Sequence, residues 1–230
     1  CIRDSRYLYL RPFQPKWSGL PHIVRTGLPA FISDVSNGIS TYAFNRTILV
    51  IANALAVSAY SILLNTALVI IYILTGIAQG VQPLLSLYFG RGDKAAVKRL
   101  WHWGLRTIFL VSVAIVAVGE LFAPQIVAFF NTQGNEALAA LATPGLRLYY
   151  LAFIPMGLNI LAVNALAAVT DARPSVILSL CRALLFPLPL VILMGMGFGL
   201  TGVWLTTPVA ESLTCLVFWG LYRRSQLAQV

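Results

Sequence analysis

Two carboxylates, Asp34 and Glu211, lie within long apolar stretches of the sequence. Asp34 follows Arg25 by nine residues, or about 14 Å of helix, and Glu211 follows Thr201 by ten. In helices that span a bilayer, both acids would be near mid-depth, where a carboxylate costs about 2.5 to 3.5 kcal/mol and must face the protein interior. Either acid could hold an ion or a proton, or form a salt bridge with a buried base. Arg182 is the candidate base for Glu211.

Polar residues extend the chemistry around Asp34 along one helical face. Asn37, Thr41 and Asn45 follow the acid by three, seven and eleven residues, and this spacing places all four on the same side of a helix. We therefore predict a polar stripe that points away from lipid. Such a stripe is typical of a water-filled cavity or a substrate path.

A second polar stripe occupies the next apolar stretch. Its members recur at spacings of three, four or seven: Ser58, Ser61, Asn65, Tyr72, Thr75, Gln79, Gln82 and Ser86. The alternative role for each is a hydrogen bond to a neighbouring helix, worth about 0.6 kcal/mol on average. A whole stripe favours a cavity or substrate path instead, and Pro83 predicts a bend beside Gln79 and Gln82.

The composition predicts that the elements carrying these residues are membrane helices. Of 230 residues, 59% are hydrophobic and 10% are charged, and no charged residue occurs between Arg46 and Arg91. A stretch of about 20 apolar residues spans a bilayer. The predicted fold is therefore an all-α integral membrane protein with helices near residues 25–49, 56–88, 101–123, 145–169, 175–196 and 201–222.

The distribution of basic residues predicts the orientation. The net charge is +9, but the Lys and Arg residues lie mainly between apolar stretches, as the positive-inside rule requires, so nucleic-acid binding is not expected. The basic residues that precede the first helix and follow the second, fourth and sixth place both ends of the chain in the cytoplasm. We expect the plasma (inner) membrane as the location and the lipid bilayer as a partner.

Motifs for catalysis and for metals are missing from the sequence. There is no GxSxG, HExxH or P-loop pattern, and the histidines, His22 and His102, fall near basic ends of helices. Cys181 and Cys215 sit within apolar stretches and are expected to be inert packing residues. We therefore predict that the protein is not an enzyme and has no cofactor.

Several sequence stretches resemble a known family of transporters. The stretch GIAQGVQPLLSLYFGRGDKAAVKR resembles a helix and cytoplasmic loop of multidrug and toxic compound extrusion (MATE) transporters. RTGLPAFISDVSNG is similar to the seventh helix of that family, ALAAVTDARPSVILSLCRALLFPLPLVIL to the tenth and eleventh, and GLTGVWLTTPVAESLT to the twelfth. The matches cover nearly all of the chain after residue 23.

The resemblance implies a function and a missing partner. The chain would be the C-terminal six-helix lobe of a twelve-helix antiporter of the bacterial branch, which exports small organic cations or drugs in exchange for H⁺ or Na⁺. Residues 1–22 would be a cytoplasmic linker and a truncation scar, and residues 23–230 the lobe. The N-terminal six-helix lobe would be the partner.

The resemblance also bears on the site residues. Asp34 corresponds to the acidic part of the family's seventh helix, and Glu211 matches a P-x-x-E pattern. Asn159 and Asn164 occupy the stretch where some members carry a second acid, so a Na⁺ site with two acids is not expected. The alternative functions are a lipid-linked oligosaccharide flippase of the same superfamily, which would favour several cavity arginines, and a non-transporting membrane scaffold subunit.

Overall fold

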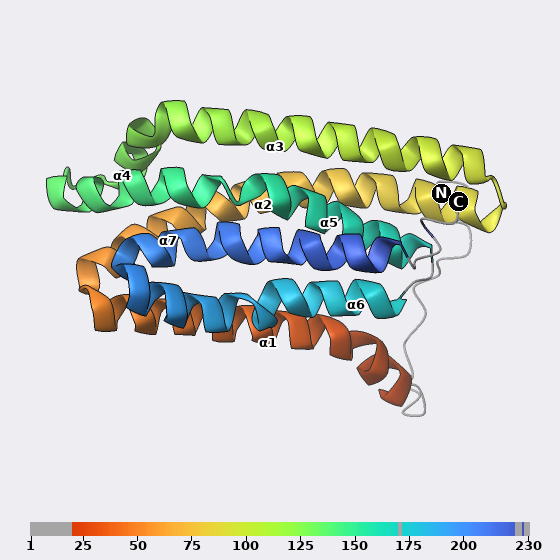
Figure 1. Ribbon diagram of the computed structural model, residues 1–230, viewed down its shortest axis with the longest axis horizontal. Helices are drawn as coiled ribbons and strands as arrows, with labels where there is room; N and C mark the ends of the chain where they lie inside the picture. The colour runs from red at the N-terminus through yellow and green to blue at the C-terminus, as the bar shows by residue number, and fades with distance from the viewer. Residues whose placement is uncertain (1–19, 170–171, 224–226, 228–230) are drawn as a thin grey trace, which may run out of the picture.

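The computed structural model describes residues 20–169, 172–223 and 227, with side chains from residue 35 onward except 172 and 173 (Figure 1). Within these ranges every regular element is helical, which confirms the predicted fold class. The elements are α1 (Leu20–Ile51), α2 (Ala54–Gly90), α3 (Lys94–Phe130), α4 (Glu136–Tyr150), α5 (Phe153–Ala168), α6 (Ala172–Leu180), the π-helix η3 (Cys181–Leu185) and α7 (Pro187–Tyr222).

Three short polar side chains mark where helices begin. Asn53 caps α2 by accepting a 3.0 Å bond from the amide of Ala56, and Asp93 caps α3 in the same way. Asn135 caps α4, which begins before the predicted fourth helix. Each cap satisfies a backbone donor that has no partner inside its own helix. Because of these caps, the connections between α1, α2, α3 and α4 are only a few residues long.

A bend between α4 and α5 and a reversal within α7 arrange the helical elements as six passes along the bundle. The axes of α4 and α5 differ by 46°, so that the pair forms one bent span, and the chain reverses direction within α7 (Figure 1). The reversal lies at Gly199, whose φ of 60° favours glycine. The passes are thus α1, α2, α3, α4 with α5, α6 through the first arm of α7, and the second arm of α7, as the sequence predicted.

The apolar helices are longer than the sequence suggested. α2 and α3 each contain 37 residues, about 55 Å of helix, so their ends extend beyond a hydrocarbon layer of about 30 Å. Residues 124–130, which follow the predicted third helix, form the end of α3. Phe122 departs from helical geometry two residues before Pro124, where the proline cannot continue the backbone ladder.

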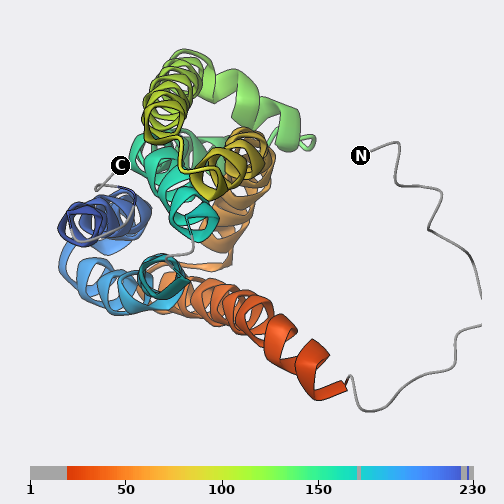
Figure 2. The same ribbon diagram turned by 90° about the vertical axis from the view of Figure 1, so that its right-hand side faces the viewer.

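Small residues bring the helices of the bundle together. A Cβ on Gly157 of α5 would lie 2.5 Å from Ser112 Oγ of α3, and a Cβ on Gly119 of α3 would collide with the ring of Tyr150. In lipid, helix association depends on such close packing rather than on burial from water. Figure 2 shows the result, with α2 and α5 between α3 on one side of the bundle and α1 on the other.

Gly202 provides a test of the reversal in α7. A Cβ on Gly202 would overlap the carbonyl oxygen of Met194 in the facing arm, whereas a Cβ on Gly197 would meet nothing within 4 Å. Backbone cannot move aside as a side chain can, so Gly202→Ala should destabilise the protein by about 1 to 3 kcal/mol. We expect a lower melting temperature for purified Gly202→Ala and little change for Gly197→Ala. Equal effects of the two substitutions would contradict this packing.

Candidate functional site

A cavity of about 380 Å³ lies among α1, α2, α5, α6, η3 and α7. Its wall combines apolar side chains with many polar ones, which is unusual for the interior of a membrane bundle. The polar lining residues are Asn37, Ser40, Thr41, Thr75, Asn164, Ser179, Arg182, Thr207 and Glu211. Hydroxyl and amide groups from five elements therefore converge on one space.

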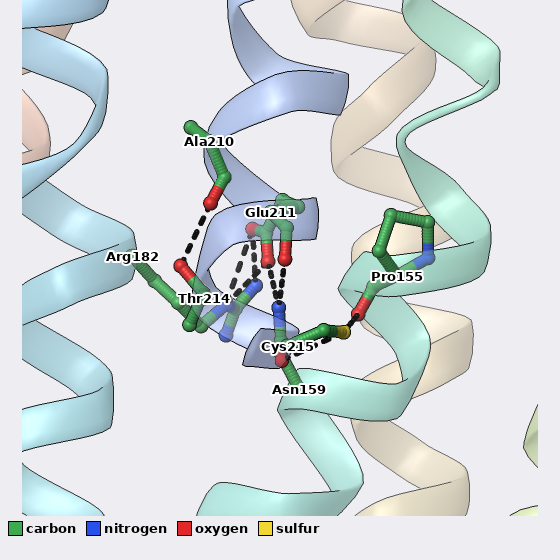
Figure 3. Close-up of polar contacts among 7 residues, drawn as sticks. All are labelled: Pro155, Asn159, Arg182, Ala210, Glu211, Thr214 and Cys215. Carbon is green, nitrogen blue, oxygen red and sulfur yellow. Dashed lines mark hydrogen bonds and ion pairs between the residues drawn. The ribbon is translucent and has the colours of Figure 1, made fainter. Parts of the chain in front are cut away.

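Glu211 is the acid of this cavity, and Arg182 holds its carboxylate. The Arg182 Nε donates to both carboxylate oxygens at 3.0 and 3.1 Å, and Nη2 donates to Oε1 at 2.9 Å (Figure 3). The salt bridge to Arg182, one of the two roles that the sequence left open for Glu211, is thus present. Glu211 is 5% exposed, so water screens the pair weakly and the attraction between the two charges is strong.

Asn159 supplies the third donor to the carboxylate. Its Nδ2 lies 2.7 Å from Glu211 Oε2 and 2.8 Å from the Glu211 backbone oxygen. The Asn159 side chain is fully buried behind Glu211 and does not line the cavity. It therefore fixes the acid from behind while Arg182 faces the open space.

Cys215 orients this asparagine. Its thiol lies one helical turn after Glu211 and contacts Asn159 Oδ1 at 3.2 Å and the Pro155 carbonyl at 3.5 Å. With its oxygen facing the thiol, the Asn159 amide must turn its NH₂ toward the carboxylate. Cys215 therefore packs against Asn159 and Pro155, and its expected inertness stays a prediction. Cys181 is buried, as predicted.

The local sequence explains why Arg182 reaches the cavity. Residues Cys181–Leu185 form a single π-helical turn, closed by the 3.2 Å bond from the amide of Phe186 to the carbonyl of Cys181. Pro187 has no N–H, so it cannot donate to the Ala183 carbonyl four residues earlier. Ser40 Oγ of α1 donates to that oxygen at 2.5 Å instead. The proline therefore creates an acceptor that ties α1 to the turn carrying Arg182.

Only some residues of the first polar stripe, on α1, line the cavity. Asn37 and Thr41 line the cavity, whereas Asn45 lies outside it with its Oδ1 buried and without a hydrogen-bond partner. Asp34 is on the helical backbone of α1, and its side chain lies outside the described residues.

The α2 stripe lies mostly outside the cavity. Only its Thr75 is part of the wall. Asn65 bonds to the Ser61 carbonyl of its own helix, Tyr72 is 71% exposed, Gln79 is exposed and Gln82 is half-buried. The sequence analysis did not single out Ser40, Ser179 or Thr207, because none of them belongs to a long periodic polar stripe.

The described helices include three that are long and apolar enough to cross a membrane, or four if α4 and α5 form one span, and they border a polar cavity, as expected of a multi-pass membrane protein. Residues 29–193 match the model of the MatE family. The chain belongs to this family, and the resemblance inferred from its motifs is confirmed.

Curated relatives are multidrug export proteins. The chain is 24% identical over 208 residues to multidrug export protein MepA of Staphylococcus saprophyticus, covering 90% of this chain and 44% of the relative. It is 26% identical over 206 residues to the protein of the same name from Staphylococcus aureus strain bovine RF122, covering 88% and 44%. The chain thus spans about half the length of the curated relatives it matches.

Solved transporters share the fold. An outward-facing multidrug resistance MATE family transporter matches with a TM-score of 0.83 at 20% identity, covering 98% of this chain and 52% of that one. A MOP superfamily transporter from Pyrococcus furiosus, described as having a binding pocket of reverse polarity, matches at 0.81 and 21% identity, covering 97% and 50%. Both matches agree with one lobe of a two-lobed protein.

The ion pair predicts a specific pattern of stability. Arg182→Gln leaves the Glu211 carboxylate buried without its cation, which should cost about 3 to 5 kcal/mol. Arg182→Gln combined with Glu211→Gln removes both charges and should recover most of that loss. Thermal melting of the purified full-length protein measures both effects. Arg147→Gln is the control, since its 3.9 Å pair with Glu120 is exposed and should contribute at most about 1 kcal/mol. A double variant as unstable as Arg182→Gln would contradict the account.

Proposed function

We propose that the chain is one lobe of a secondary active antiporter that exports organic cations or drugs in exchange for H⁺ or Na⁺. The names of the curated relatives support export, and the activity is that of the whole protein. The observation that carries the proposal is the Glu211 carboxylate, held by Arg182 and Asn159 at the wall of a polar cavity inside an apolar bundle. A charged group in a membrane is costly, and those that occur there commonly mark an ion or substrate path.

The ion pair gives the lobe a way to respond to a proton. Protonation of Glu211 removes the charge that holds the Arg182 guanidinium and leaves that cation facing the cavity. With Glu211 protonated the cavity presents the positive charge of Arg182, and with Glu211 ionised it presents a neutral pair. Binding of a proton to Glu211 therefore disfavours binding of a cationic substrate. Ser40 on α1 bonds the turn that carries Arg182, and movement of the arginine is thereby passed to α1.

The coupling ion favoured by this geometry is H⁺. The Glu211 oxygens already accept bonds from Arg182 and Asn159, whereas Na⁺ requires free oxygen ligands. The described part of α5 carries no acid, as the sequence indicated. Asp34 stays a predicted coupling residue whose role only experiment can assign.

An aromatic stack favours planar organic substrates. Phe44 and Tyr60 both line the cavity and stack with ring centroids 5.3 Å apart, and Trp204 continues the stack at 6.1 Å from Tyr60. The rings are nearly buried and stacked on one another, so they form a flat apolar part of the wall. This wall accommodates flat amphipathic cations without a dedicated hydrogen-bond pattern.

The two alternatives make different demands on the same cavity. A lipid-linked oligosaccharide flippase calls for several cavity arginines, and the described lining holds one, Arg182, whose charge Glu211 balances. A non-transporting scaffold needs no acid at this depth. The cavity therefore favours the antiporter over both alternatives.

The proposed setting follows the topology predicted from the basic residues. Residues 23–230 form the C-terminal lobe in the plasma membrane, with both ends of the chain on the cytoplasmic side. Residues 1–22 enter the lobe as a linker, and residues 1–19 of it lie outside the described part of the structure. An N-terminal six-helix lobe completes the cavity.

Export measured in vesicles tests this proposal. We expect the full-length protein to extrude a fluorescent organic cation under an imposed H⁺ gradient, and Glu211→Gln to lower the initial rate at least about tenfold, because the variant can no longer exchange a proton. Asp34→Asn tests the second acid, and a Na⁺ gradient alone tests the other ion.

Glu120→Gln is the matched control, since Glu120 is a half-exposed acid on α3 outside the cavity. It should export at the wild-type rate. Wild-type rates in Glu211→Gln would exclude Glu211 as the coupling residue, and a wild type that moves no cation under either gradient would overturn the antiporter proposal.

A further inference from the structure

The first four turns of α3 carry a continuous basic face that plays no part in the cavity. Lys94, Lys98, His102 and Arg106 recur every four residues, and Arg91 and Arg99 flank them. All six side chains are exposed, and we call them the basic face. The spacing places the ladder on one side of the helix over about 18 Å.

The other side of α3 is buried, which fixes the direction of the basic face. Val97, Trp101, Gly104 and Ile108 are buried, and α3 packs against α2, α4 and α5. Figures 1 and 2 show α3 on the side of the bundle opposite α1. The basic face is therefore turned outward, away from the cavity that α1 lines.

The acid nearest in sequence to the basic face, Asp93, serves as a helix cap. Asp93 directs its carboxylate to the amide of Ala96 at 2.9 Å as the cap of α3. Among the residues that the structure describes, no carboxylate pairs with Lys98, Arg99 or Arg106. Several like charges are thus held near one another on an exposed surface, and such a surface attracts an anionic partner.

Apolar side chains continue the same face directly beyond the charges. Phe109, Leu110 and Val113 are 46%, 66% and 39% exposed, and Trp103, 69% exposed, lies beside His102. Tryptophan at this position is typical of the boundary between headgroups and acyl chains. A cationic band followed along one helix face by an apolar band matches the shape and chemistry of a phospholipid.

We propose that the basic face binds an anionic phospholipid of the leaflet on that side of the membrane. The phosphate lies against Lys98, His102 and Arg106, and the acyl chains run over Phe109 and Val113. Basic side chains near the surface each attract anionic lipid appreciably, and a cluster of them selects it over zwitterionic lipid. The positive-inside rule alone would place the charges in the loop between α2 and α3. Here they extend along the outer face of α3 as far as the lipid-facing residues.

Lipid retention measured by native mass spectrometry tests the proposal. The full-length protein is reconstituted in vesicles of phosphatidylcholine with phosphatidylglycerol and then extracted, and the ratio of the two retained lipids is measured. We expect the wild type to retain phosphatidylglycerol preferentially. Lys98→Gln combined with Arg106→Gln should weaken that binding about 30-fold, since two of the attracting charges are lost.

Arg147→Gln is the matched control, because it removes an exposed charge on α4 rather than on the basic face. It should keep the wild-type preference. Melting temperatures in a neutral detergent establish that the variants are folded, which is expected for exposed positions.

Three results would overturn the proposal. They are equal retention of phosphatidylglycerol by the double variant and the wild type, an equal loss in Arg147→Gln, or no preference in the wild type. If the wild type shows no preference, an acidic protein would be the partner of the basic face instead. None of these outcomes depends on whether the protein exports cations.

Discussion

The structure depends on one constraint, which is that a buried charge in an apolar bundle must be matched. Glu211 is nearly inaccessible, and its carboxylate is matched by the Arg182 guanidinium and the Asn159 amide. The π-turn before Pro187 brings Arg182 to the acid, and Ser40 satisfies the carbonyl that the proline leaves without its helical donor. Four elements are thereby held together by polar contacts in a place where packing alone has little specificity.

This constraint also shapes the cavity. Because the one described acid of its wall is paired with the one arginine, the wall is polar but balanced in charge. The stacked rings of Phe44 and Tyr60 lie in the same wall as the pair, so that apolar and charged groups border one space.

Much of the fold could be predicted from the sequence, because apolar stretches, caps and glycines act locally. The six passes and the candidate Arg182–Glu211 pair followed from length, spacing and depth. The contacts of Asn159 and Cys215 and the bond from Ser40 to Ala183 could not be predicted, because they depend on the rotation of each helix against its neighbours. The same limit applies to α2, whose periodic stripe fixed a common face but not what that face contacts. The periodicity was right, but only Thr75 lies on the cavity wall.

The most direct test of this account is a structure of the full-length protein in a lipid bilayer without substrate. The quantity to measure is the distance between Arg182 Nη2 and Glu211 Oε1. We expect this distance to be near 2.9 Å. The pair should face a polar cavity between two lobes, with Asn159 behind the acid. An arginine directed toward lipid, or a Glu211 carboxylate bound to another group while the cavity is empty, would contradict it.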